Sequence, residues 1–245
     1  MLDKIKSIKK INHESKRYDI EVDKVHNFYA NDILVHNCQN LTKEYEGWKT
    51  ERFYVTEKLD GSSATFYLKD GVFGVCSRNL ELADPGEFVP GTIIGEDGVE
   101  RTKKENTFWK VARELKIAEK LGSLNQNYAI QGELIGEGIQ GNPYKIKGHT
   151  LRVFNIFNID TQEYLGLDEM REFLSKVNND DKPLELVPVL EENYSLPETV
   201  DEILLYAEGK SKLYNGAERE GVVIRNKDKT ISFKSISNSF LLKEK

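Results

Sequence analysis

The feature of this sequence that most limits its fold is the shortness of its apolar runs, which are rich in β-branched and aromatic residues. Runs of this kind, bounded by turn-forming residues, are typical of strands. From Arg52 onward the predicted strands are residues 53–55, 64–68, 72–75, 128–135, 151–159, 222–225 and 231–233. Lys69-Asp70-Gly71 and residues 226–229 are hairpin signals, so the runs that they join should pair antiparallel.

Three other stretches repeat apolar residues at helical spacing; they are residues 106–121, 167–177 and 199–207. Asn106 or Thr107 is placed to cap the first of these helices, and Gly122 is placed to end it. The mixture of helices and hairpin-linked strands predicts an α+β fold, with antiparallel sheets and flanking helices.

The composition is that of a soluble protein with one sizeable core. The chain has 245 residues, 38% of them hydrophobic, and no apolar run approaches the ~18 residues of a membrane span. The first residues lack the apolar stretch of a secretory signal, and two cysteines with four histidines give neither a disulfide framework nor zinc-ligand spacing. We therefore expect a cytoplasmic protein without a membrane partner.

The net charge of −6 argues mildly against nucleic-acid binding by the whole surface. Residues 1–37 hold seven Lys/Arg and six Asp/Glu, which leaves 28 basic and 35 acidic residues in the remainder. Because local patches decide nucleic-acid binding, we expect such a partner to meet a local groove or a basic partner domain.

The tripeptide His36-Asn37-Cys38 carries a specific cleavage chemistry. An Asn side-chain amide can attack its own carbonyl, form a succinimide and cut the chain after itself, while a neighbouring His donates a proton to the leaving amine. A Cys directly after the cut is a nucleophile that accepts an acyl group from another segment. Alone the tripeptide is a weak signal, because any tripeptide occurs by chance.

Preceded by the strand-like Tyr18-Asp19 and by His26-Asn27-Phe28, this tripeptide resembles the terminal blocks of inteins. The resemblance implies a role for each of five residues: Asp19 and His26 assist catalysis, His36 promotes cyclisation, Asn37 cyclises and Cys38 is the first extein residue. The N-terminal intein blocks are absent from the sequence, which implies the C-terminal fragment of a split intein that works with a partner precursor chain.

This interpretation divides the chain into two parts. Residues 1–37 would be the intein fragment, a small β structure, and residues 38–245 would be the domain that it releases. The alternative is that residues 1–37 are a small β appendage in which His36 is incidental.

A second set of motifs begins with Glu57-Lys58-Leu59-Asp60-Gly61, directly after a predicted strand. Lys-x-Asp-Gly alone is a weak signal, because it also suits a surface turn with the Lys in water. The later motifs follow it in order; they are Ser77-Arg78-Asn79, Gln131-Gly132-Glu133-Leu134, Phe154-Asn155-Ile156, Glu218-Arg219-Glu220-Gly221 and Phe233-Lys234-Ser235. As an ordered set they resemble the motifs of the covalent nucleotidyltransferases, that is, ATP ligases and RNA capping enzymes.

Finer details resemble one branch, the nick-sealing RNA ligases of the Deinococcus type; the segment from Gln131 to Tyr144 is an example. This resemblance implies an ATP-grasp-like ligase domain, ATP and Mg²⁺ as cofactors, and nicked RNA or an RNA-containing duplex as substrate. That branch carries an OB domain before the catalytic domain, so the resemblance implies that the partner precursor chain carries the OB domain here.

The same resemblance assigns roles to the motif residues. A lysine with the ordinary pKa of about 10.4 is protonated at neutral pH, so a lysine nucleophile needs burial or nearby positive charge. Lys58 would attack the α-phosphorus of ATP and form lysyl-AMP, Lys234 would hold the α-phosphate, and Glu220 would bind Mg²⁺. The remaining nucleotide contacts would be Glu133 on a ribose hydroxyl, Arg78 on the ribose or the RNA-end phosphate, Phe154 stacked on adenine and Glu57 on its amino group.

Other interpretations of these residues stay open. Taken singly, Glu133 and Glu220 would most often be solvated carboxylates, Arg78 a surface donor and Phe154 a core residue. The set also fits a DNA ligase, a capping enzyme that prefers GTP, or a nucleotide-binding module without chemistry.

One part of the last motif departs from the family pattern. Many relatives have Lys-x-Lys there, whereas Ser232 and Ile236 flank Lys234 at two residues on either side. One phosphate contact is then either missing or supplied from elsewhere, with Lys243 as the candidate.

Overall fold

The structure, a computed structural model, describes residues 8–10, 18–20, 27–30, 33–36, 41–86, 89–94, 99–102, 105–227 and 230–243. The helices are α1 (Leu41–Trp48), α2 (Thr107–Glu114), α3 (Ile117–Gly122), α4 (Leu167–Val177), α5 (Val200–Ala207) and α6 (Asn238–Lys243). Within these ranges no helix has both the length and the apolar character needed to cross a membrane.

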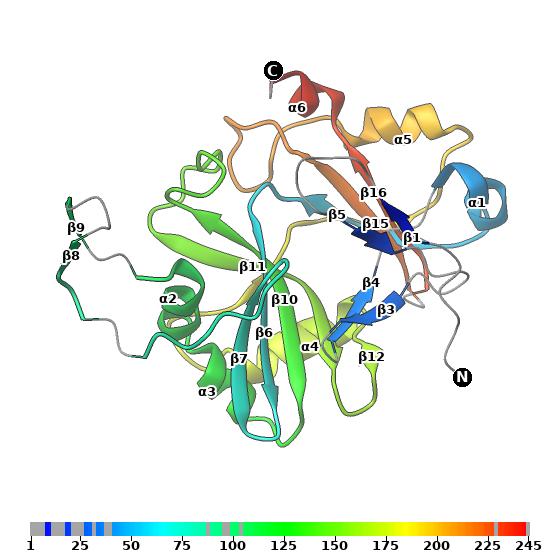
Figure 1. The fold of residues 1–245 in the computed structure, drawn as a ribbon. Helices are drawn as coiled ribbons and strands as arrows, with labels where there is room; N and C mark the ends of the chain where they lie inside the picture. The colour runs from blue at the N-terminus through cyan, green and yellow to red at the C-terminus, as the bar shows by residue number, and fades with distance from the viewer. Residues whose placement is uncertain are drawn as a thin grey trace.

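Two mostly antiparallel sheets form the body of the molecule (Figure 1). The larger sheet has the order β12-β11-β10-β6-β7, and short β13 pairs in parallel with β11. Its strands are β6 (Ser62–Lys69), β7 (Val72–Ser77), β10 (Tyr128–Gly136), β11 (His149–Asn158), β12 (Glu163–Tyr164) and β13 (Glu185–Leu186). The smaller sheet has the order β14-β5-β15-β16; its strands are β5 (Phe53–Lys58), β14 (Val189–Tyr194), β15 (Gly221–Asn226) and β16 (Ser232–Ile236). The predicted α+β fold with antiparallel sheets is confirmed.

Each sheet buries one face against helices. The larger sheet packs on α2, α3 and α4 through a cluster that contains the fully buried Phe66, Ile130, Leu134 and Ile156. The smaller sheet packs on α1 and α5 through a second cluster that contains Phe53, Val222, Ile224 and Phe233. The ring of Trp48 in α1 stacks on Phe233, with 5.7 Å between the ring centroids.

A third, smaller cluster connects the two sheets. It consists of Leu59, Ile135, Tyr144 and Val187, which come from the link after β5, from β10, from the link between β10 and β11, and from the segment before β14. The apolar contacts of this cluster stabilise the join at which the candidate site lies.

The local turn signals are confirmed where they are strongest. Lys69 pairs with Val72, and the turn residues Asp70 and Gly71 have φ angles of 51° and 79°. Two consecutive positive φ angles are the requirement of a type I′ turn, which Asp-Gly tolerates. The helix predicted at 167–177 is α4, and Thr199 is the N-cap of α5, with its hydroxyl accepting from the amide of Glu202 at 3.4 Å.

The single helix predicted over residues 106–121 is wrong, because the chain is interrupted between α2 and α3. Lys116 has a φ of 52°, in the left-handed region, and stands between the two helices. The interruption changes which residues face the core: Ile117 is fully buried, whereas Ala118, which the uninterrupted spacing selects, is only half-buried.

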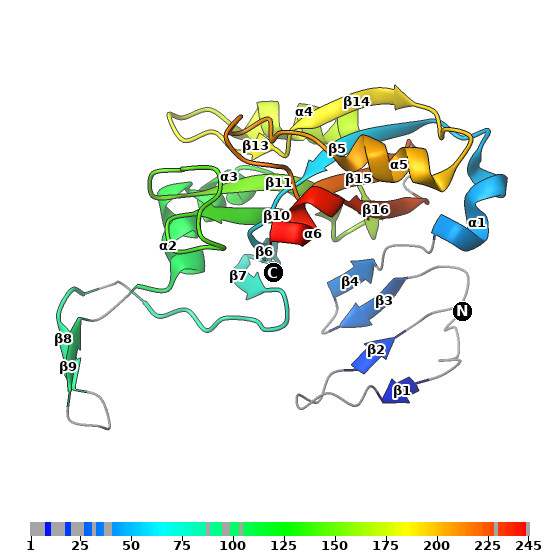
Figure 2. The same cartoon turned by 90° about the horizontal axis from the view of Figure 1, so that it is seen from above.

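The N-terminal residues form two hairpins outside both large sheets (Figure 2). Strand β1 (Ile8–Lys10) pairs with β2 (Tyr18–Ile20), and β3 (Asn27–Ala30) pairs with β4 (Ile33–His36). Asp19 lies in β2 and His36 ends β4. His26, Asn37 and Cys38 lie outside the described residues.

Asn106 tests how far a local capping interaction stabilises this fold. Its side-chain oxygen accepts from the amides of Phe108 and Trp109 at 3.0 and 3.2 Å. We expect Asn106→Ala to lower the free energy of unfolding by about 1 kcal/mol, because two amides at the start of α2 lose their acceptor. Urea denaturation measures this change. Asn106→Asp keeps the acceptor and should stay close to the parent chain; an equal loss in both variants would contradict the capping role.

Candidate active site

The centre of the candidate site is a contact between Lys58 and Glu220. Lys58 ends β5 and pairs in register with Gly221, the first residue of β15, so the register brings Glu220 beside it. The Nζ of Lys58 lies 2.5 Å from the Oε1 of Glu220, and the two side chains are 24% and 16% exposed. A Cβ added at Gly221 would lie 2.1 Å from the carbonyl oxygen of Ser235, so only glycine lets β16 pack at this point.

Glu133 joins this pair from the larger sheet. It lies in β10, directly opposite Ser63 on β6. The pKa of the Glu133 carboxyl is raised to about 7, mainly by burial and further by the negative charges of Glu220 and Asp60. The positive charges of Lys58 and Arg78 act in the opposite direction and offset part of this rise. Lys58, Glu220 and Arg78, each part of a different motif, are thus near enough to Glu133 for their charges to act on its carboxyl.

Phe154 reaches its position through a β-bulge in β11. Gln131 pairs with Asn155 and the next residue, Gly132, pairs with Val153, so Phe154 has no opposite residue. On either side of it, Val153 and Ile156 are both fully buried in the cluster under the helices. Residues three apart in a regular strand point to opposite faces, so Val153 and Ile156 share a face only because of the bulge. The bulge also turns Phe154 away from that face, and its ring packs against the third cluster.

Glu57 lies behind the nucleophile candidate and is only 1% exposed. Successive side chains of a strand point to opposite faces, so Glu57 and Lys58 leave β5 in opposite directions. Its Oε2 accepts from the amide of Lys212 at 2.8 Å, while Oε1 is buried without a hydrogen-bond partner in the described part of the chain. Burial raises the pKa of this carboxyl, and the neighbouring Ser211 hydroxyl and Lys212 amide partly offset the effect.

Lys234 and Arg78 lie at the rim of this group with exposed side chains. Lys234 in β16 pairs with Val223, which pairs with Thr56 two residues before Lys58, so Lys234 and Lys58 share one face of the smaller sheet. Arg78 directly follows β7. The side chain of Lys243 lies outside the described residues.

Two residues with evident positional roles were quoted in the motifs but given no function from the sequence. The hydroxyl of Tyr144 accepts from the amide of Asp60 at 2.6 Å, beside the nucleophile candidate. The guanidinium of Arg219 donates to the carbonyl oxygens of Tyr206, Ala207 and Glu208 at the end of α5, and so anchors the segment before Glu220. In the sequence both residues could be recognised only as members of a motif, because nothing in their spacing indicates which residues they contact.

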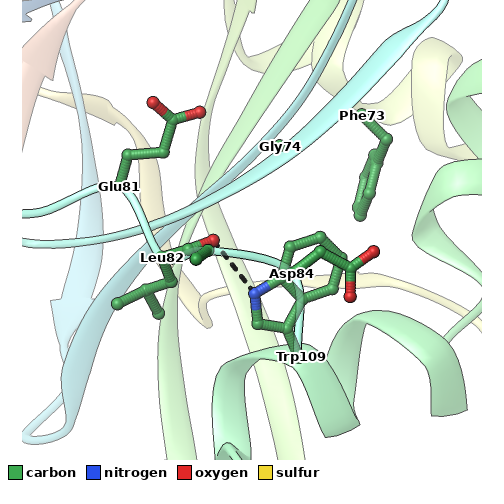
Figure 3. A pocket seen from close by; sticks show the side chains of 7 residues that line it. Phe73, Gly74, Glu81, Leu82, Asp84 and Trp109 are labelled. Atoms are coloured by element: carbon green, nitrogen blue, oxygen red, sulfur yellow. Dashed lines mark hydrogen bonds between the residues drawn. The ribbon is translucent and has the colours of Figure 1, made fainter. Parts of the chain in front are cut away.

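A separate hollow of about 340 Å³ lies on the helix side of the larger sheet (Figure 3). It is lined by Phe73, Gly74, Glu81, Leu82, Ala83, Asp84 and Trp109. Both of its carboxylates are already engaged, Glu81 by the hydroxyl of Tyr67 and Asp84 by Arg113 at 3.3 Å. The hollow shares no residue with the Lys58 group, and we place no reaction there.

A model of the RNA ligase family matches residues 51–243. The chain belongs to the RNA ligase family. The matched span contains Lys58, Glu133, Glu220 and Lys234, and begins after the N-terminal hairpins.

Solved structures of an RNA ligase from Naegleria gruberi have the same fold. A mutant form solved with AMP and Mn is 36% identical with a TM-score of 0.73, and covers 89% of this chain and 60% of that one. Another mutant form, solved with ATP and Mn, is 36% identical with a TM-score of 0.74, and covers 91% of this chain and 61% of that one. The chain therefore spans about three fifths of the solved ligases.

Two curated proteins match a shorter stretch. The tRNA-splicing ligase RtcB of Methanocaldococcus jannaschii is 34% identical over 131 residues, which are 51% of this chain and 12% of that protein. A DNA polymerase of Thermococcus litoralis is 28% identical over 144 residues, which are 54% of this chain and 8% of that protein. Because the chain spans about a tenth of these proteins, their named activities are not carried over to it.

The raised pKa of Glu133 makes a prediction about stability. Folding raises this pKa from 4.5 to about 7, so the folded state favours the protonated carboxyl and loses stability as the pH rises from 4.5 to 7. Glutamine imitates the protonated form. We therefore expect Glu133→Gln to raise the unfolding free energy of the ligand-free protein by roughly 1–3 kcal/mol at pH 8 and by clearly less at pH 5.

Urea denaturation at the two pH values measures both differences. The matched control is Glu163→Gln, an exposed glutamate in β12, which should change stability little at either pH. A gain of the same size at pH 5 and pH 8 would show that ionisation of Glu133 is not the cause.

Proposed function

We propose that this chain is the catalytic part of an ATP-dependent RNA ligase that seals nicks through a lysyl-AMP intermediate on Lys58. The observation that carries the proposal is the contact between the Nζ of Lys58 and the Oε1 of Glu220 at 2.5 Å. Both groups are close enough to Glu133 for their charges to act on its carboxyl. Membership of the RNA ligase family and the ATP, AMP and Mn held by the Naegleria gruberi structures support it.

The proposed reaction has three steps, and Lys58 forms and then loses a covalent bond in the first two. Its deprotonated Nζ attacks the α-phosphorus of ATP, forming an N–P bond as the bond to pyrophosphate breaks. A 5′-phosphate oxygen of the RNA then attacks the same phosphorus, which moves AMP to the RNA end and frees Lys58. Finally the 3′-hydroxyl of the adjoining strand attacks the 5′-phosphorus, forming the phosphodiester and releasing AMP.

Glu220 is the proposed ligand for Mg²⁺. A carboxylate is the hard oxygen donor that Mg²⁺ prefers, and Mg²⁺ commonly takes one or two carboxylates together with phosphate oxygens and water. The described residues contain no group of three or more acidic, His or Cys side chains arranged around a metal position, which fits such a shared site. A bound divalent cation neutralises charge on the phosphate oxygens.

The remaining residues are proposed to hold the nucleotide. Phe154 is turned toward the join of the sheets by its bulge, and supplies a ring for the adenine. The unpaired Oε1 of Glu57 supplies an acceptor for the adenine amino group. Glu133 would accept from a ribose hydroxyl, while Lys234 and Arg78 supply positive charge from the rim for phosphate oxygens.

Lys58 tests the ligase proposal directly. We expect Lys58→Ala to abolish covalent labelling by α-labelled ATP, because no phosphoramidate can form, and Lys58→Arg to fail because a guanidinium stays protonated. The measurement is incubation with ATP and Mg²⁺ followed by a denaturing gel. Lys69→Ala, which removes an exposed lysine from the β6–β7 hairpin, is the control and should keep its label. Wild-type labelling of Lys58→Ala would refute the proposal, and labelling by GTP but not ATP would favour a capping enzyme.

We also propose that residues 1–37 are the C-terminal fragment of a split intein, joined to a ligase domain at residues 38–245. The support is the chemistry of His36-Asn37-Cys38 together with two further features. Asp19 and His36 lie in paired strands, and the RNA ligase match begins only at residue 51. On this proposal a partner precursor carries the complementary intein fragment and the OB domain, and the spliced ligase acts on nicked RNA duplexes in the cytoplasm.

The splicing proposal predicts different products for two variants. Mixed with its partner precursor, the chain should lose residues 1–37 and gain a new segment through a peptide bond at Cys38. Asn37→Ala removes the cyclising amide, so it should stop at a branched intermediate whose new segment is linked to the Cys38 sulfur as a thioester. Cys38→Ala removes the acyl acceptor, so it should give cleavage without ligation.

Mass spectrometry of the mixtures distinguishes these products. Self-adenylation on Lys58 serves as the control, since neither variant touches the ligase residues. A mature ligase of full sealing activity that still carries residues 1–37 would overturn the splicing proposal and leave the ligase proposal intact.

A further inference from the structure

The link between β10 and β11, residues 137–148, has an unusual backbone. Counting Gly136 at its start, seven residues have positive φ angles; they are Gly136, Gly138, Gln140, Gly141, Asn142, Lys145 and Gly148. Three of these are not glycine, and a left-handed conformation costs such a residue about 1–2 kcal/mol. Conformations of this kind persist only where the surrounding structure fixes them.

The link is fixed partly by its own hydrogen bonds. The side-chain oxygen of Asn142 accepts from the amide of Ile146 at 3.0 Å, and its side-chain nitrogen donates to the carbonyl oxygen of the same residue at 2.8 Å. Tyr144 lies in the chain between Asn142 and Ile146. Its ring is 4% exposed and packs in the cluster with Leu59 and Ile135. The link therefore presents the Tyr144 hydroxyl in one position.

That position is the turn after Lys58. The amide of Asp60 donates to the Tyr144 hydroxyl at 2.6 Å, and the Nε2 of Gln140 donates more weakly, at 3.4 Å, to the carbonyl oxygen of Gly61. From the other side, β10 lies so close that a Cβ on Gly61 would stand 2.5 Å from the carbonyl oxygen of Leu134. Residues 59–61 are thus held between β10 and the link.

We propose that Tyr144 is a positioning residue for Lys58: its hydroxyl holds the amide of Asp60 and thereby fixes the direction in which the lysine leaves the end of β5. The proposal rests on the proposed function of Lys58 as the nucleophile. Burial raises the pKa of Tyr144, so the hydroxyl stays neutral and keeps its hydrogen-bonding role at the pH of the reaction. Positioning matters because a displacement of about 1 Å in a reacting group lowers a rate by roughly 100-fold.

Tyr144→Phe separates the hydroxyl from the ring, because it keeps the packing in the third cluster. We expect the single-turnover rate of lysyl-AMP formation at saturating ATP to fall roughly 10-fold to 100-fold. The ATP concentration that gives half the maximal rate should change little, because the hydroxyl is assigned no contact with the nucleotide. Peptides covering residues 58–63 should exchange their amide hydrogens faster.

Tyr128→Phe is the matched control. The Tyr128 hydroxyl donates to the side chain of Gln126 at 2.7 Å, and its ring is also buried, in the cluster on the helix side of the larger sheet. Loss of this hydroxyl should leave both the adenylation rate and exchange at residues 58–63 unchanged. Both variants are compared at a temperature at which circular dichroism shows them fully folded, so that a difference in stability does not enter the rates.

Three results overturn the positioning role. An unchanged single-turnover rate in Tyr144→Phe with faster exchange at residues 58–63 would show that the hydrogen bond exists but does not position Lys58. Equal losses in Tyr144→Phe and Tyr128→Phe would show a general effect of losing a buried hydroxyl. A rise in the half-saturating ATP concentration without a lower maximal rate would assign Tyr144 to nucleotide binding. Absence of lysyl-AMP in the parent chain would instead defeat the proposed function, and the positioning role with it.

Discussion

Strand β5 is the physical link on which the arrangement of this molecule depends. It lies between β14 and β15, so both of its edges are hydrogen-bonded, and one of its faces is buried in the core of the smaller sheet. Its last residue is Lys58, and only residues 59–61 separate it from β6 in the larger sheet. A connection this short couples the orientation of the two sheets to the direction of the lysine. The third apolar cluster and the link at 137–148 close around the same three residues.

Negatively charged side chains gather at the join of the two sheets, and their burial and mutual repulsion lower the stability of the ligand-free fold. The charges of Asp60 and Glu220 act on Glu133, and the raised pKa of Glu133 reflects burial and like charge that Lys58 only partly offsets. Gathering titratable groups in this way lowers the stability of the ligand-free fold, as is common at functional sites. A ligand that brings positive charge or hydrogen-bond donors to these carboxylates should stabilise the fold by mass action.

The sequence predicted best those features that depend on neighbouring residues. The Asp70-Gly71 turn, the Asn106 cap and the limits of α4 all follow from side chains within a few positions, and all are confirmed. The break at Lys116 was missed because the apolar spacing on both sides of it still suited one helix, and a left-handed residue leaves no signal when it is not glycine.

The candidate site was predicted as a set of motifs and not as a geometry. Motif order named Lys58, Glu133 and Glu220, but it gave no register, and it is the register of β5 with β15 that places Lys58 beside Glu220. The contact of Tyr144 with Asp60 joins residues 84 positions apart, which no local pattern encodes. The roles of Asp19, His26, His36, Asn37 and Cys38 remain predictions, since the side chains of all five are outside the described structure.

The bulge at Phe154 has a consequence for how this fold can change. Along a regular strand successive side chains point alternately to the two faces of the sheet, so one residue cannot change face unless every other residue of the strand does. One unpaired residue reverses the parity of everything beyond it. Removing Phe154 itself would leave Val153, Asn155 and Ile156 in regular alternation with the same partners on β10, so Ile156 would stay buried and only the Phe154 ring would be lost. The position of the Phe154 ring against the third cluster therefore depends on one extra residue in β11, which can be lost without changing which side chains of the strand face the core.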